Sequence, residues 1–232
     1  CPAGFGCDGT DAMYAVADSS ELAIMLDAWL EDATSAKVKY GRLPVWDTSN
    51  VTVIPVQTSE DGSIRGIGGK KNFDEDISGW DVSSVIAMSN LFRENTVFNQ
   101  PIGGWDVSKV EYMFDMFKGA TAFNQPIGGW DMSKVRYMEH TFYGATAFNQ
   151  PIGGWDVSKV RSFVCTFCLT GNNTFNPAIG DWDVSGLWRL GGFGKWQWDD
   201  GQNNKGSEAA TGGMFGDSDA FNASIGGWDT SR

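Results

Sequence analysis

An aspartate follows each tryptophan of a recurring W-D-x-S motif, and this series of carboxylates is the first feature of the sequence that could do chemistry. If equivalent residues stack at the strand spacing of a sheet, about 4.8 Å, neighbouring carboxylates repel by roughly 1 kcal/mol even in water. Backbone N–H groups of the same turn, three nearby lysines or bridging calcium ions could compensate. The aspartates are Asp81, Asp106, Asp131, Asp156 and Asp183, and the lysines are Lys109, Lys134 and Lys159.

Calcium is the weaker of these alternatives. One carboxylate per copy supplies few of the roughly 6–8 oxygens that the ion takes. We therefore expect a structural role for the aspartates, with no metal and no other cofactor, and keep calcium as the alternative.

Four cysteines could form disulfides or hold a metal. Cys1 and Cys7 enclose a short loop, and Cys165 and Cys168 have C-x-x-C spacing. The first pair has the wrong spacing for a structural zinc site and no histidine is near, while no βαβ pattern supports a redox C-x-x-C. Disulfides are favoured, and with three N-x-S/T sequons, at Asn50, Asn172 and Asn222, they predict an extracellular setting with N-glycosylation.

Aromatic residues gather in one irregular stretch that could bind a ligand. The segment L-W-R-L-G-G-F-G-K-W-Q-W contains Trp188, Phe193, Trp196 and Trp198 among glycines and polar residues. Long loops on a rigid scaffold often carry binding sites, and exposed aromatic faces suit a glycan or a protein. The alternative is that these rings pack on the flank of the scaffold, because exposed tryptophans are uncommon.

Catalytic motifs are missing from the sequence. It contains no G-x-S-x-G, no H-E-x-x-H and no P-loop, and its single histidine, His140, lies at a position that varies between the repeated copies. We expect no enzyme. The formal charge of −12 and the pI near 4.4 argue against nucleic acid as a partner, and no run of 18 apolar residues predicts a membrane span.

The elements that position these residues follow from an internal repeat. The phrase F-N-Q-P-I-G-G-W-D occurs at 98–106, 123–131 and 148–156, each copy 25 residues after the last. Seven W-D-x-S motifs begin at Trp46, Trp80, Trp105, Trp130, Trp155, Trp182 and Trp228. A fixed period of this length is typical of stacked repeat proteins and falls in the leucine-rich-repeat range.

The apolar positions within one copy indicate the shape of the coil. They are Trp105, Val107, Val110, Met113, Phe117, Ala120, Phe123 and Ile127. Steps of about three residues fit neither a long strand nor a long helix, but they fit a coil whose side chains point inward and are buried by its neighbours. The predicted fold is a leucine-rich-repeat-like solenoid of about seven coils, with a short strand at W-D-V-S, a helical turn at M-x-x-M-F and a turn at N-Q-P.

The pattern V-x-x-M-x-x-M-F-x-G-A-x-x-F-N-x-x-I-x-x-W-D-x-S, read at 110–133, resembles the repeat of the BspA-like leucine-rich-repeat surface proteins. The resemblance covers roughly residues 20–232. It implies a secreted or cell-surface solenoid in a family associated with adhesion and surface structure, and it implies no particular reaction or partner. Two stretches depart from the pattern, 57–71 and 187–213.

A helix is expected before the first copy. Leu22, Met25, Leu26 and Trp29 share one helical face, and Asp18 with Glu21 forms a capping-box pattern. Such a helix would cover the open core of the first coil, whereas its acidic polar face does not suit a membrane. The expected organisation is an N-terminal segment with cysteines and a capping α-helix at 1–45, followed by the solenoid at 46–232.

The function predicted from the sequence is that of an extracellular or cell-surface structural or adhesive protein, or a unit of a larger filament or coat. No capping segment follows Trp228, so we expect either a longer protein or self-association and protein partners at that end. The alternative function is a surface module that recognises glycan or protein through the insertion at 187–213.

Overall fold

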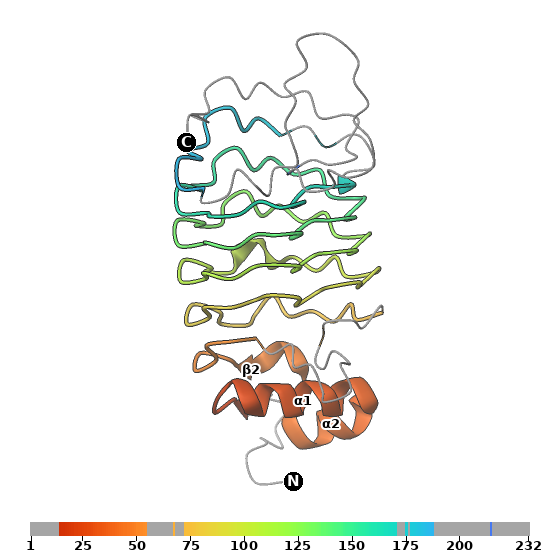
Figure 1. Cartoon of the computed structure of the whole chain (residues 1–232). Coiled ribbons are helices and arrows are strands. Elements are labelled where there is room, and N and C mark those ends of the chain that lie inside the picture. Colours follow the sequence, from red (N-terminus) through yellow and green to blue (C-terminus); the bar gives the residue numbers. More distant parts are fainter. Residues whose placement is uncertain are drawn as a thin grey trace.

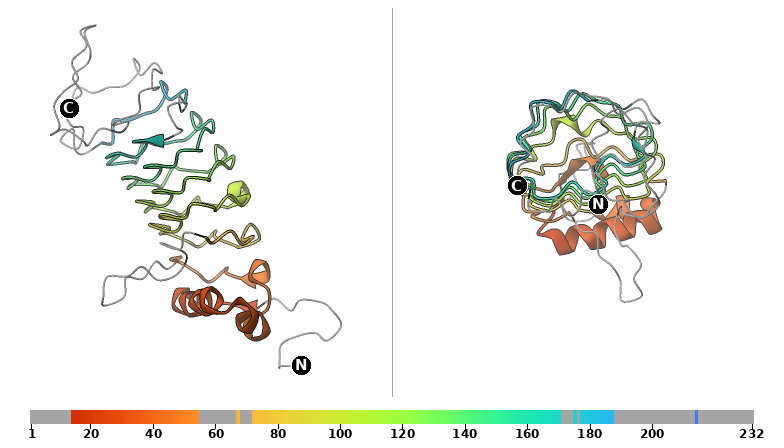
Figure 2. Two further views of the ribbon diagram at one scale, coloured as in Figure 1. Left: turned by 90° about the vertical axis from the view of Figure 1, so that its right-hand side faces the viewer. Right: turned by 45° about the horizontal axis from the view of Figure 1, so that its top comes forward.

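The chain forms an elongated stack of coils with two helices at one end. The computed structural model describes residues 14–54, 67, 72–170, 175, 177–187 and 214. Helices α1 (Ser19–Glu31) and α2 (Ala33–Tyr40) lie at the N-terminal end, and the coils follow one above another along a single axis (Figure 1). In an oblique view over the end of the stack, successive coils lie over one another (Figure 2).

Side-chain caps define where the helices begin. The Asp18 carboxylate accepts hydrogen bonds from the backbone N–H groups of Ser20 and Glu21, which satisfies two of the donors that a helix start leaves unpaired. The Glu21 carboxylate accepts from the N–H of Ala17, close to the reciprocal pattern of a capping box. Asp32 ends α1 and caps α2, a second helix that the sequence analysis did not predict.

Helix α1 packs against the first coil. Leu22, Met25 and Leu26 are fully buried and belong to the same hydrophobic core as the coils. Trp29 meets Trp46 edge to face with ring centroids 6.0 Å apart. Strand β1 (Tyr14–Ala15) also joins the first coil by pairing parallel with β2 (Trp46–Asp47), and the 3₁₀ helix η1 (Leu43–Val45) leads into β2.

The predicted strand position is wrong in the described coils after β2. At each W-D-x-S motif the chain makes a tight turn, in which the N–H of Val110, for example, donates to the carbonyl of Val107 at 2.9 Å. Parallel pairing occurs seven residues after each tryptophan instead, in a series of bridges that join Val53, Ala87, Tyr112, Tyr137 and Ser162. Residues that form this turn cannot also adopt the extended conformation of a strand. The parallel bridges therefore begin only after the turn.

The M-x-x-M-F segments are turns whose N–H groups alternate between two kinds of partner. In the coil after Trp105, the N–H groups of 113, 115, 117 and 119 donate to carbonyls of the next coil, while those of 116, 118 and 120 donate within their own coil. The 3₁₀ helix η2 (Ile102–Gly104) directly precedes Trp105, as η1 directly precedes Trp46. These seven backbone donors are thus satisfied without a regular helix or strand.

The interior is filled by columns of equivalent side chains. All eight apolar positions predicted from the copy after Trp105 are buried, none more than 4% exposed. Phe123 stacks between Phe98 and Phe148, with ring centroids 6.2 and 6.0 Å away. Each indole N–H of Trp105, Trp130 and Trp155 donates to an isoleucine carbonyl of the preceding coil at 3.1–3.3 Å. The residues that repeat from copy to copy therefore make the contacts between coils.

Candidate functional site

The aspartates after each tryptophan are held by their own turns. The carboxylates of Asp81, Asp106, Asp131, Asp156 and Asp183 are exposed, and each accepts a hydrogen bond from the backbone N–H two residues later at 2.9–3.0 Å. The hydroxyl of Ser133 and then its N–H lower the pKa of Asp131, and Ser108 does the same for Asp106. Lys109 and Lys134 lower the pKa of Asp106 further, as smaller contributions.

These turns compensate the repulsion expected along the column. Within residues 14–54, 72–170 and 177–187, no three side chains of His, Cys, Asp or Glu are grouped as a metal site. Each of the five carboxylates accepts a backbone hydrogen bond that closes an Asx turn.

An amide ladder joins the N-Q-P turns of successive coils. The side-chain oxygen of Asn99 accepts from the N–H of Asn124 at 2.9 Å, and that of Asn124 accepts from the N–H of Asn149 at the same distance. The amides of Gln125 and Gln150 donate to the same two asparagines. We call this side of the stack, built by the phrases at 98–106, 123–131 and 148–156, the constant side.

Cys165 and Cys168 form a disulfide that closes a turn also present in the three preceding coils. At the equivalent pair, Arg93 donates to the Asn90 amide oxygen at 3.4 Å, Lys118 pairs with Asp115 at 3.5 Å, and His140 meets Tyr143 edge to face at 6.0 Å. The first residue of each pair has a positive φ, between 46° and 63°. Asn, Asp and His tolerate this left-handed conformation better than most residues, which explains their use there.

The remaining sequence predictions divide between described and undescribed residues. Asn50 is exposed in the turn after β2, so a glycan attached there would not have to enter the buried core. Trp188, Phe193, Trp196, Trp198, Cys1, Cys7, Asn172 and Asn222 lie outside the described residues. None of the helices in the described part of the chain has the length and apolar character to cross a membrane.

The parallel bridges define a second surface, which we call the ladder face: residues 86–90, 111–115, 136–140 and 161–165. The rings of Tyr112 and Tyr137 stack on it with centroids 5.3 Å apart and planes 9° from parallel. Phe114 is 41% exposed beside them. A shallow depression of about 500 Å³ lies here, lined by Tyr112, Phe114, Asp115, Tyr137, Glu139 and His140.

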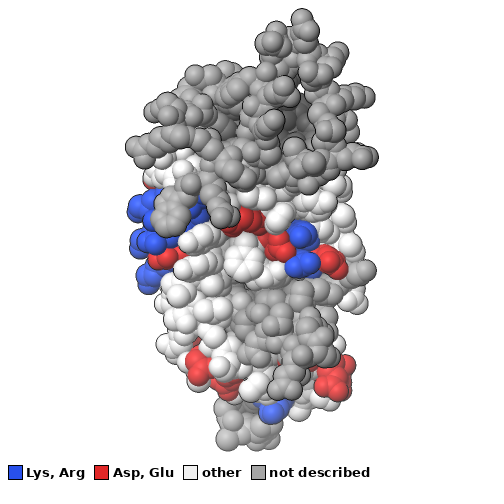
Figure 3. All heavy atoms as spheres, viewed as in Figure 1, with Lys and Arg blue, Asp and Glu red and all other residues white. Residues whose placement is uncertain are grey.

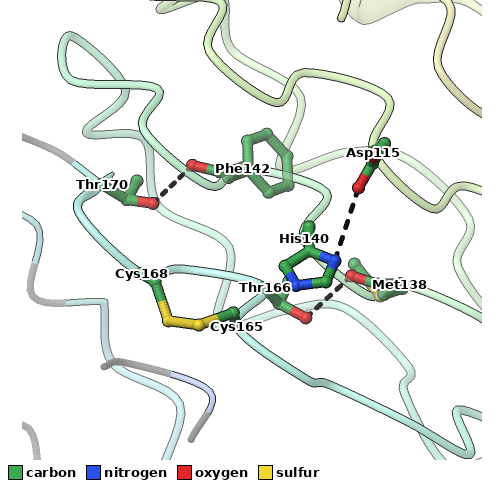
Figure 4. The surroundings of a disulfide bond; sticks show 8 residues. All are labelled: Asp115, Met138, His140, Phe142, Cys165, Thr166, Cys168 and Thr170. Atoms are coloured by element: carbon green, nitrogen blue, oxygen red, sulfur yellow. Dashed lines mark hydrogen bonds and ion pairs between the residues drawn. A yellow bond between two sulfur atoms is a disulfide. The ribbon is translucent and has the colours of Figure 1, made fainter. Parts of the chain in front are cut away.

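Asp115 forms a charged cluster at the edge of this depression. It is 8% exposed, and its carboxylate lies 2.8 Å from Arg93 Nη1 and 3.5 Å from Lys118 Nζ. The Nδ1 atom of His140 lies 3.4 Å from the same carboxylate, and Figure 4 shows the imidazole directed at it. Because Arg93, Asp115 and His140 come from three successive coils, the cluster exists only when the coils stack.

The pKa of His140 is lowered. Burial is the main cause, followed by the Lys118 ammonium, and Asp115 opposes both. The lowered pKa favours the neutral form of the imidazole, whose Nδ1 atom faces the Asp115 carboxylate.

Sequence analysis noted His140 as a variable position and missed Tyr112, Phe114, Tyr137 and Glu139. The signal that could have found them is the variation itself, because these positions differ between copies whose other residues repeat. Their meeting at one depression could not be read from a single copy.

Comparison with known proteins gives the family. No curated protein and no solved structure matches the chain. A family model with the description "Mycoplasma protein of unknown function, DUF285" matches residues 63–182 and 197–232. These residues make up more than half of the chain and contain all the tryptophans that begin W-D-x-S motifs from Trp80 to Trp228. The chain therefore belongs to the DUF285 family.

Proposed function

We propose that this protein is an extracellular or cell-surface structural and adhesive repeat protein, a BspA-like leucine-rich-repeat solenoid of about seven coils whose ladder face recognises its partners. The observation that carries the proposal is the contrast between repeated and varied positions. Between 98 and 156 the constant side repeats the same nine residues three times, whereas the outward residues of the ladder face change from coil to coil.

The two kinds of position make different contacts. On the constant side, the Asn oxygens, the Gln amides and the indole N–H groups all bond to a neighbouring coil. On the ladder face, neighbouring coils are joined by backbone bridges. A face held by its backbone leaves its outward side chains free to vary, which suits recognition on a rigid scaffold.

The partners in this proposal are other proteins, further copies of the chain or glycans, and the proposal includes no reaction and no cofactor. Its setting outside the cell agrees with the Cys165–Cys168 disulfide, since such bonds persist in oxidising compartments, and with the exposed sequon at Asn50.

The test is to locate the native protein and image it. Antibodies against the folded chain are applied to source cells with and without permeabilisation, and the purified native particle is examined by electron microscopy. We expect labelling of intact cells, and rods or filaments with a regular spacing. Labelling that needs permeabilisation would contradict the proposal.

A further inference from the structure

We propose that the depression on the ladder face between Tyr112 and His140 binds a neutral carbohydrate ring. The inference rests on the proposed function in using the ladder face for recognition, and it adds the chemical class of the ligand. It is carried by three independent features: the aromatic rings, the hydrogen-bonding character of the polar groups and the pairing of charges.

The aromatic rings offer uncovered faces. Tyr112 and Tyr137 stack on each other, and their next neighbours in the column of bridges are Ala87 and Ser162. Those side chains are too short to cover a ring. Tyr112 is 38% exposed and Phe114 is 41% exposed, while Tyr137 is partly exposed. The C–H groups on one side of a pyranose pack well against such a face, because the face of an aromatic ring is electron-rich.

The polar groups around the rings accept hydrogen bonds. Glu139 lines the depression and makes no ion pair with another described residue. The Nδ1 atom of His140 lies 3.4 Å from Asp115, and in the tautomer that carries its proton there the Nε2 atom is an acceptor. A ligand that combines an apolar face with several hydroxyl donors therefore matches the site, whereas a purely apolar ligand would leave these acceptors unpaired.

Most charged groups beside the depression are paired with one another, which favours a neutral ligand. Asp115 is paired with Arg93 and Lys118, and Glu111 is paired with Arg136 at 3.4 Å. Figure 3 shows acidic and basic side chains beside one another across the middle coils. Glu94 also pairs with Arg93, at 3.8 Å. Glu139 is therefore the carboxylate in this group without a basic partner among the described residues, and its charge disfavours an anionic ligand.

The experiment measures saturation transfer by NMR from the full chain to single probes. The neutral probes are the methyl glycosides of glucose, galactose, mannose and N-acetylglucosamine; choline and glucuronate are the charged probes. We expect transfer to at least one neutral glycoside and none to choline or glucuronate. Substituting Tyr112→Ala or Tyr137→Ala is expected to weaken that binding about tenfold, as loss of a central aromatic contact does.

Two further variants keep the test decisive. Ala87→Tyr leaves every residue of the depression in place and fills the space beside Tyr112, so it should abolish binding even if Tyr112→Ala fails to fold. Val53→Ala changes the same column one bridge beyond Ala87 and should leave binding unchanged.

Three results would overturn the proposal: no transfer to any neutral glycoside, binding that survives both tyrosine substitutions and Ala87→Tyr, or transfer to choline or glucuronate in place of the glycosides. Sugar binding by a protein that labels only permeabilised cells would retain this site and reject the proposed extracellular function.

Discussion

The constant side and the ladder face belong to the same coils, yet they are stabilised in different ways. On the constant side, side chains hold one coil to the next through the Asn99–Asn124–Asn149 ladder and the tryptophan indoles. On the ladder face, parallel backbone bridges hold the coils, and side chains such as Tyr112 and Phe114 are exposed. The first surface therefore needs particular residues, and the second tolerates substitution.

This difference explains why the residues of the constant side repeat exactly while those of the ladder face vary. Gly103, Gly128 and Gly153 each lie where a Cβ atom would overlap a carbonyl oxygen of the next coil, while the glycine after each of them has open space. Stacking constrains the residues of the constant side, whereas each rung of the ladder face can take a side chain of its own.

Removing a ring from the interior of the constant side should have the largest effect. Phe123 is fully buried between two stacked phenylalanines, so Phe123→Ala is expected to cost about 4 kcal/mol of unfolding free energy. Phe114→Ala is the matched control: the same change on the ladder face, where the ring is 41% exposed, should stay within about 0.5 kcal/mol. Urea unfolding followed by tryptophan fluorescence measures both, and equal losses would erase the distinction between the surfaces.

Adding one methyl group should separate the two glycines of a single turn. In Gly128→Ala the new Cβ collides with the carbonyl oxygen of Pro151, and displacing that backbone should cost about 3 kcal/mol. Gly129→Ala adds the same atom where no heavy atom lies within 4 Å, so its unfolding midpoint should stay close to that of the parent. If Gly129→Ala is the more damaging change, the stacking contact assigned to Gly128 is wrong.

The disulfide should matter less than either interior change. Cys165 and Cys168 close a loop of four residues, for which the chain-entropy relation gives about 2 kcal/mol. Replacing both cysteines by alanine should lower the unfolding free energy by that amount and leave the other coils folded. An unchanged midpoint would mean that the turn is held by its backbone alone, as the equivalent turn with Lys118 and Asp115 is held without a covalent bond.

The smallest effect is expected at an exposed aspartate of the constant side. The residue is Asp131, whose pKa is lowered mainly by the Ser133 hydroxyl. The ionised carboxylate therefore stabilises the fold at pH values above the ordinary carboxyl pKa. This stability is lost as the pH falls through the lowered pKa. Ser133→Ala should raise the pKa of Asp131 toward about 3.9 and reduce the stability lost between about pH 5 and pH 3 by at most about 0.5 kcal/mol after solvent screening.

Lys134→Gln is the control for that titration, because Lys134 is the last of the causes that lower the pKa of Asp131. NMR titration of the carboxyl resonance compares the two variants. A larger shift in Lys134→Gln than in Ser133→Ala would show that charge screening, and not the turn, sets the pKa.

Much of the interior could be predicted from the sequence. The eight apolar positions of the copy that begins at Trp105 are buried, and α1 begins where Asp18 and Glu21 place it. These features depend on residue type and spacing within a short stretch of sequence. Such local patterns can be recognised without knowing the tertiary structure.

Other features could not be predicted because they depend on competition between neighbours. The strand position differs because the hydrogen bond of Asp131 to the N–H of Ser133 favours a turn where the apolar pattern suggested extended chain. Helix α2 has little hydrophobic pattern of its own, and its start depends on Asp32, which also ends α1.

By itself the sequence determined the period of the repeat, which apolar residues are buried and which residues each turn requires. A repeated local pattern encodes local geometry and burial. Only the tertiary structure decided what the varied residues form together. Arg93, Asp115 and His140 meet, and Tyr112 stacks on Tyr137, because stacking brings side chains about 25 residues apart in sequence into contact, and no single copy contains that information.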